Sequence, residues 1–170
     1  MKSRLIVLAL LLLFLAATCF AALQSENWDI PPGLQEYQVL KVVDGDTIWV
    51  KDLGKVRYTG IDAPEIKHGD REAEPYGYDA MEANRRLVLG KSVKIELDMA
   101  KRDRYGRVLG YVYRDPVFVN AYLVEAGYAY AIKVKPNVKH YPLFLKLQKE
   151  ASRAGRGLWG LPVQNKQDHL

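Results

Sequence analysis

The sequence contains one cysteine, Cys19, and three histidines among 170 residues. A single thiol excludes an intramolecular disulfide framework and any zinc site built on several cysteines. Internal repeats and low-complexity tracts are also missing. The composition, 49% hydrophobic and 26% charged, is that of a folded globular protein of about one domain. Catalysis by this chain must therefore use oxygen and nitrogen groups.

Residues 1–21 have the anatomy of a signal peptide, because a short basic stretch precedes an unbroken apolar run from Leu5 to Ala17. We predict cleavage after Ala21 and export as a secreted or periplasmic protein. Two alternatives would also export the domain. The first is an uncleaved anchor over residues 5–22, which predicts membrane association because the N-terminal segment is retained, and the second is lipid modification of Cys19.

The remaining chain divides into a linker over 22–35, a folded domain over 36–160 and a polar tail over 161–170. The linker lacks periodicity and contains Pro31-Pro32-Gly33. Five apolar runs in the domain have the length and composition of strands. They are Tyr37–Val43, Thr47–Asp52, Lys55–Ile61, Ser92–Asp98 and Arg107–Arg114.

Helical spacing predicts three further elements: one between Pro75 and Gly90, one over Val117–Glu125, and one whose apolar stripe runs from Leu143 to Ala154. Strands and helices do not alternate, so a doubly wound parallel sheet is excluded. The order predicts a mainly β fold with α elements: a five-stranded OB-fold Greek-key barrel capped by three helices. We expect a monomer.

The segment Asp44-Gly45-Asp46-Thr47 lies between two of the predicted strands. Taken alone it predicts a hairpin turn, because glycine accepts the positive φ that such turns demand. Asp46 nevertheless places a second carboxylate at the start of a strand, where it can point into the mouth of the barrel.

The segment from Arg57 to Glu65 reads RYTGIDAPE. Asp62 and Glu65 flank a proline that restricts the local backbone, so two carboxylates project from one short turn. Taken alone, this pattern favours a helix cap at Asp62 with Pro64 just inside the helix, followed by a solvated Glu65.

A third charged segment, from Lys101 to Arg107, forms a predicted hairpin tip and brings Arg107 to the start of a strand. Together the three segments supply carboxylates for a hard cation, one carboxylate for proton transfer and two arginines for an anion. Phosphodiester hydrolysis needs that set. A calcium-sized ion takes several oxygen ligands at about 2.3–2.6 Å.

These segments resemble the staphylococcal nuclease (thermonuclease) family, and the similarity extends from Tyr37 to Trp159. The motifs that carry it follow in order along the chain. They are Val43-Asp44-Gly45-Asp46-Thr47, RYTGIDAPE from Arg57, Lys67-His68, Asp103-Arg104-Tyr105-Gly106-Arg107, and Val119-Asn120 with Leu123–Gly127.

The resemblance implies a helix-capped OB-fold barrel, a Ca²⁺ cofactor, and endonucleolytic cleavage of DNA and RNA that leaves 3′-phosphate ends. It implies that the carboxylates of Asp46 and Asp62 and the backbone carbonyl of Ala63 bind calcium. It further implies that Glu65 activates the attacking water, and that Arg57 and Arg107 hold the phosphate.

The sequence departs from the family in two places. Ala63 stands where the best-known member has threonine, and Ala131–Lys135 reads AIKVK where the family enzyme has tyrosines beside the substrate. Loss of these rings removes base stacking worth about 1–3 kcal/mol per base. Two other functions remain as alternatives: an OB-fold module that binds nucleic acid without cutting it, and a surface-tethered calcium-binding or adhesion domain.

Overall fold

The computed structural model describes residues 30–161. The predicted signal peptide and all of the predicted tail except Leu161 lie outside this range. Within it, no helix has the length and apolar character needed to cross a membrane. Ile30 and Leu34, which fall in the predicted linker, pack against the hydrophobic core.

The strands form a small closed barrel. The larger sheet has the order β3-β2-β1-β5-β6-β7, and a parallel pairing of β3 with β6 closes it, while β4 and β8 form a second sheet. This topology confirms the predicted OB-fold-like barrel. The strands are β1 Glu36–Val42, β2 Thr47–Val50, β3 Gly54–Tyr58, β4 Ile61–Asp62, β5 Ser92–Arg102, β6 Val108–Arg114, β7 Val117–Phe118 and β8 Tyr130–Ala131.

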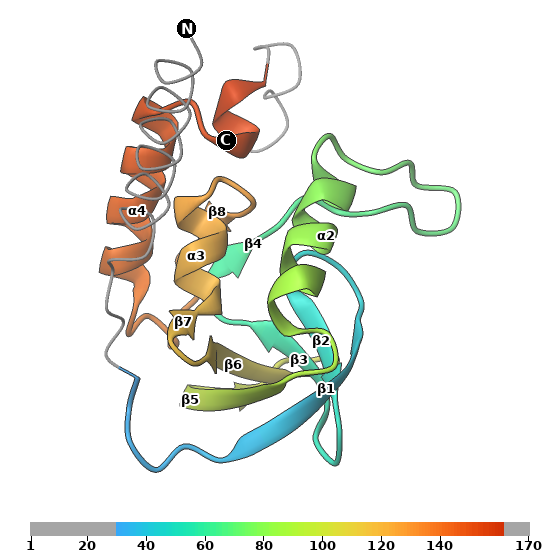
Figure 1. The fold of residues 1–170 in the computed structure, drawn as a ribbon, viewed down its shortest axis with the longest axis vertical. Coiled ribbons are helices and arrows are strands. Elements are labelled where there is room, and N and C mark those ends of the chain that lie inside the picture. Colours follow the sequence, from blue (N-terminus) through green and yellow to red (C-terminus); the bar gives the residue numbers. More distant parts are fainter. Residues whose placement is uncertain (1–29, 162–170) are drawn as a thin grey trace, which may run out of the picture.

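Three helices cap this barrel, as predicted, and Figure 1 shows them gathered on one side of the strands β1, β5 and β6. They are α2 Gly77–Val88, α3 Val119–Glu125 and α4 Tyr141–Arg153, and a 3-10 turn, η1 Gly157–Gly160, follows. Inward-facing strand residues such as Ile48 and Val56 share a core with Leu123 of α3 and Phe144 of α4. The core therefore lies between the barrel and its helical cap.

Several predicted boundaries differ from those in the structure, and two of the differences change which elements pair. The strand predicted over Lys55–Ile61 ends at Tyr58, because Gly60 adopts a φ of 78° that breaks the extended backbone. Ile61–Asp62 instead pair with β8. The helix predicted from Val117 begins at Val119, since the two preceding residues are extended and pair with β6.

A buried carboxylate, Glu96 on β5, joins the barrel to the start of α4. It accepts hydrogen bonds from the Tyr113 hydroxyl at 2.7 Å and from Lys139, and it lies 3.0 Å from His140 Nε2. Burial alone would raise the pKa of Glu96, but these partners outweigh it and hold the pKa below its usual range. The folded state therefore favours the ionised form.

We expect Glu96→Gln to destabilise the fold in a pH-dependent way. A lowered folded-state pKa contributes stability above the unfolded value of about 4.3, and this contribution is lost as the pH falls through the folded value. At neutral pH the loss should be about 1.5–3 kcal/mol, the range for a hydrogen bond to a charged group. Thermal melts should show a Tm difference from wild type that is largest at pH 7 and shrinks below pH 4.

Glu82→Gln is the matched control. Glu82 pairs with Arg86 at 3.1 Å on an exposed face of α2, and such surface pairs contribute about 0–1 kcal/mol. If the Tm difference between Glu96→Gln and wild type is the same at pH 7 and pH 3, ionisation of Glu96 does not contribute to stability.

Candidate functional site

The loop between β1 and β2 folds around its own acidic side chains. Asp44 Oδ1 accepts a hydrogen bond from the Asp46 amide at 3.0 Å, while the Thr47 carbonyl accepts one from the Val43 amide at 2.9 Å. Asp46 is only 5% exposed, and its Oδ1 accepts a further bond from the Thr47 hydroxyl at 3.2 Å. The loop therefore fixes one buried carboxylate at the start of β2.

Gly45 is required here by close packing and not by backbone conformation. Its φ is not positive, so the predicted reason for this glycine is wrong. A Cβ at this position would lie 2.5 Å from Ala63 Cβ and 2.9 Å from Ala80 Cβ. The absence of a side chain lets the acidic loop approach both the segment after β4 and helix α2.

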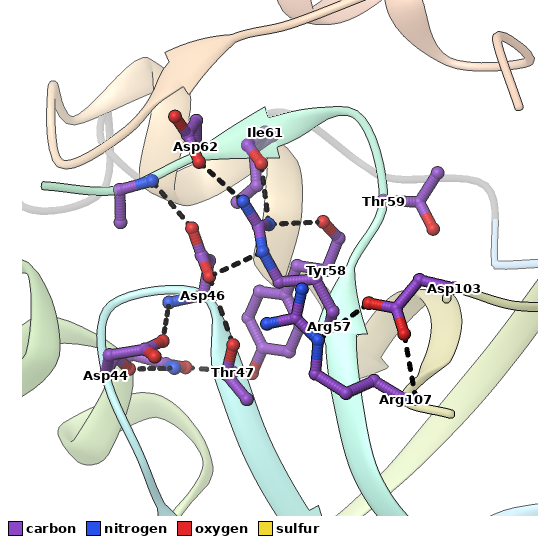
Figure 2. A network of polar contacts seen from close by, with 12 residues as sticks. Asp44, Asp46, Thr47, Arg57, Tyr58, Thr59, Ile61, Asp62, Asp103 and Arg107 are labelled. Atoms are coloured by element: carbon purple, nitrogen blue, oxygen red, sulfur yellow. Dashed lines mark hydrogen bonds and ion pairs between the residues drawn. The ribbon is translucent and has the colours of Figure 1, made fainter. Parts of the chain in front are cut away.

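Arg57 of β3 lies between the two carboxylates predicted to bind metal (Figure 2). Its Nε contacts Asp46 Oδ1 at 3.0 Å, and its Nη2 contacts Asp62 Oδ1 at 2.6 Å. Its Nη1 donates to the carbonyls of Tyr58 at 2.8 Å and Ile61 at 2.7 Å. Four of the five guanidinium N–H groups are thus used within the protein, which leaves one for a ligand.

Asp62 and Ala63 reach the site through β4. The pairing of β4 with β8 places Asp62 opposite Tyr130, and the Ala63 amide donates to Asp46 Oδ2 at 2.7 Å. The hydrogen bond that Ala63 makes to the acidic loop is therefore through its N–H group. The predicted role of its carbonyl as a calcium ligand stays a prediction.

The electrostatics of Asp46 reflect its burial among like charges. Burial raises the pKa of Asp46 above its ordinary range, and the neighbouring Asp44 and Asp62 raise it further, whereas Arg57 and the Ala63 amide lower it. A single arginine thus faces several carboxylates. An additional cation would be favourable at this position.

Glu65 lies in the same negative field but at the surface. Desolvation is the first cause that raises the pKa of Glu65, followed by Asp44, Asp62 and Glu74, while Arg57 lowers it. A carboxylate with a raised pKa is a better proton acceptor than an ordinary glutamate near neutral pH. The structure thus brings Glu65 within electrostatic reach of the acidic cluster.

The backbone of Glu65 is held from both sides by the segment that leads into α2. Its amide donates to Glu74 Oε2 at 2.9 Å, and its carbonyl accepts from the Glu74 amide at 2.9 Å. A Cβ on Gly77 would lie 2.4 Å from the Glu65 carbonyl oxygen, so glycine lets the start of α2 approach this backbone. The position of Glu65 therefore depends on a segment that no sequence motif indicated.

Arg107 extends from the β5–β6 turn toward the side of β3 that carries Arg57 (Figure 2). Asp103 holds it by an Nε–Oδ2 ion pair of 2.7 Å and accepts the Arg107 backbone amide at 3.0 Å. Within residues 30–161, its two Nη groups have no hydrogen-bond or ion-pair partner. Arg107 is therefore the arginine with more donors left for an anion.

Two buried asparagines support the site: Asn120 belongs to a sequence motif to which no role was assigned, and Asn84 belongs to none. The Asn84 amide of α2 accepts from the Tyr58 hydroxyl at 2.9 Å and donates to the Asp44 carbonyl at 3.1 Å. Asn120 of α3 donates to the Thr59 carbonyl at 3.0 Å. They tie the acidic loop and the end of β3 to the helical cap.

Two carboxylates among the described residues, Asp46 and Asp62, are candidate oxygen ligands for a cation. Between residues 30 and 161, no group of three or more histidine, cysteine, aspartate or glutamate side chains is arranged to hold a metal. Asp46 and Asp62, however, face the same guanidinium. A carboxylate has about four lone-pair sites, and Asp46 uses three of them on Arg57, Thr47 and Ala63, so one stays available for a cation.

Several proteins with similar sequences are named as nucleases. The family described as staphylococcal nuclease homologue matches residues 55–160. The chain is 35% identical over 128 residues to the thermonuclease of Staphylococcus hyicus, an alignment that covers 74% of this chain and 76% of that protein. It is 40% identical over 126 residues to an uncharacterized endonuclease of Escherichia coli, with coverages of 72% and 75%. It is also 40% identical over 124 residues to the SPbeta prophage-derived endonuclease YokF of Bacillus subtilis (strain 168), and covers 42% of YokF.

Proposed function

Because the chain belongs to the staphylococcal nuclease family, we propose that it is an exported, calcium-dependent nuclease that hydrolyses phosphodiester bonds of DNA and RNA and leaves 3′-phosphate ends. The observation that carries the proposal is the joining of Asp46, Arg57 and Asp62 by ion pairs of 3.0 and 2.6 Å. Glu65 interacts electrostatically with two members of this cluster, Asp62 and Arg57. The cluster combines a cation site, a proton acceptor and phosphate-binding donors.

In the proposed reaction, Asp46 and Asp62 would hold a calcium ion. When bound, calcium supplies positive charge that stabilises the phosphate oxygens and favours deprotonation of a nearby water. Glu65 orients this water and accepts its proton as the water oxygen attacks phosphorus. The phosphorus–O5′ bond breaks in line with the attack, the 5′ oxygen takes a proton from solvent, and the phosphate stays on the 3′ side.

The two arginines have different parts in this mechanism. Arg107 offers both Nη groups to the phosphate oxygens, whose negative charge grows during attack. Arg57 has one N–H group left and acts mainly by holding Asp46 and Asp62 in position. Arg57 can therefore donate fewer hydrogen bonds to the phosphate than Arg107, although both residues are predicted to hold it.

Hydrolysis of single-stranded DNA by the purified protein, with calcium and again with calcium chelated, tests this function. We expect cleavage with calcium and none with the chelator. Parallel reactions on RNA test the substrate range, and release of inorganic phosphate from the products by a 3′-phosphatase identifies the ends. Cleavage that continues after chelation would contradict the calcium dependence.

A binding module without catalysis is the second candidate. It predicts that DNA stays intact under both conditions while the protein retains it in a gel-shift experiment. The electrostatics favour the enzyme, because a pure binding surface does not require Glu65 within the field of Asp44 and Asp62.

Export is proposed from the amino-terminal segment, which lies outside the described residues. The intact mass of the natively processed protein tests it, because cleavage after Ala21 removes the first 21 residues. A retained Met1 would favour the anchor instead.

A further inference from the structure

One row of side chains crosses the outer face of β1, β2 and β3. Strand register pairs Lys41 with Trp49 and Trp49 with Lys55, so the tryptophan lies between two lysines on neighbouring strands. Trp49 is 43% exposed, and both lysines are exposed. We call these three residues the Trp49 row.

The Trp49 row lies directly beside the catalytic cluster. Side chains alternate along a strand, so Trp49 shares a face of β2 with Thr47, and Lys55 shares a face of β3 with Arg57. Thr47 and Arg57 are themselves a cross-strand pair. Two residues along each strand, or about 7 Å, separate the Trp49 row from the Thr47–Arg57 pair.

Charge and exposure make this row suitable for a polyanion with flat bases. Across the described residues, neither Lys41 nor Lys55 forms an ion pair with a carboxylate. Exposed lysines attract phosphates, and an exposed indole offers a face on which a base can stack. By contrast, the segment from Ala131 to Lys135 contains no aromatic residue.

We propose that the Trp49 row binds a single-stranded nucleic acid segment next to the scissile phosphate, with one base stacked on Trp49 and the backbone phosphates bound by Lys41 and Lys55. The proposal rests on the proposed function. It names single strands because a base within a duplex is already stacked on its neighbours. The row would hold substrates that extend beyond the nucleotides at the cleavage site.

Steady-state cleavage of an oligothymidylate of eight nucleotides and of a dinucleotide, both with calcium, tests the proposal. Trp49→Ala should raise KM for the octamer about tenfold, the change expected when stacking of about 1.4 kcal/mol is lost. The kcat values and the KM for the dinucleotide should not change, and Trp49→Phe should retain most of the affinity. An octamer KM equal to that of wild type would overturn the proposal.

Tyr122→Ala is the control for loss of an exposed ring, since Tyr122 lies on α3 and is 39% exposed. For charge, the double variant Lys41→Gln/Lys55→Gln should reduce the dependence of log affinity on log salt by about 1.4, which is 0.7 for each phosphate that a lysine no longer neutralises. Lys146→Gln/Lys149→Gln on α4 removes the same charge elsewhere. Equal effects of the two double variants would mean nonspecific attraction and would overturn the assigned role of the lysines.

A readout independent of cleavage separates this proposal from the proposed function. Titration with the octamer in the absence of calcium should quench tryptophan emission in wild type, and the quenching should be absent in Trp49→Phe, which keeps Trp28 and Trp159. If quenching occurs but no substrate is cut, the result supports nucleic acid binding by the Trp49 row and contradicts the enzymatic function. If cleavage occurs but quenching is the same in both proteins, the result supports the enzymatic function and contradicts base stacking on Trp49.

Discussion

Replacing Glu65 by glutamine should lower kcat for DNA cleavage by about 10²–10⁴-fold, the usual contribution of a general base. The amide keeps the size of the side chain but cannot accept the proton of the attacking water. Glu65 suits this task because desolvation and the nearby carboxylates raise its pKa. Calcium affinity should change little, since the proposed ligands Asp46 and Asp62 are untouched.

The measurement combines kcat at saturating calcium with calcium affinity from calorimetry. Glu72→Gln is the matched control, because Glu72 is an exposed glutamate in the same segment and pairs with Lys67 at 2.8 Å. It should leave both quantities unchanged. A Glu65→Gln variant with wild-type kcat would remove Glu65 from the mechanism and leave water activation to another group.

The fold was predictable because its signals are local. Alternating apolar residues in short runs mark most of the barrel strands, and the stripes on α2 and α4 have helical spacing. The break between β3 and β4 was missed because it depends on the backbone of Gly60, within an apolar run that reads as one strand. Phe118 was assigned to a helix because it adjoins a helical stripe, although its hydrogen bonds go to β6.

The sequence motifs also contain the acidic and basic side chains that the structure brings together, but not Asn84, which supports them. Short motifs contain Asp46, Asp62 and Arg57, whereas Asn84 meets Tyr58 across 26 residues of sequence. From sequence alone, a polar residue on a helix is predicted to face solvent unless its distant hydrogen-bond partner is known. Sequence spacing contains no information about such pairs.

Histidine 140 illustrates the same limit. None of the sequence motifs includes His140, yet the structure places its Nε2 3.0 Å from the buried Glu96 carboxylate. Forty-four residues separate the two side chains, and only the docking of α4 against the barrel brings them together. Long-range packing decides which polar residues become buried partners.

Arg57 and Arg107 should differ in what their loss does to the fold, although loss of either should abolish most cleavage. Arg57→Ala leaves the buried Asp46 without its ion-pair partner, and breaking such a pair costs about 3–5 kcal/mol. Arg107 and Asp103 form a half-buried pair, and Asp103 keeps its bonds from the Tyr105 and Arg107 backbone amides, so Arg107→Ala should cost less stability, about 1–2 kcal/mol. Its loss should still reduce kcat by about 10²–10³-fold, as removal of a donor to developing negative charge does.

The free energy of unfolding in denaturant and kcat should both be measured for the two variants. Together they show whether an arginine stabilises the fold or acts only in catalysis. The double variant Arg57→Ala/Asp46→Asn provides the internal control, because it removes the unpaired buried charge together with its partner. Stability should then recover toward wild type while cleavage stays absent. If Arg57→Ala is as stable as wild type, Arg57 does not hold the carboxylates in place, and its part in catalysis would be the phosphate clamp alone.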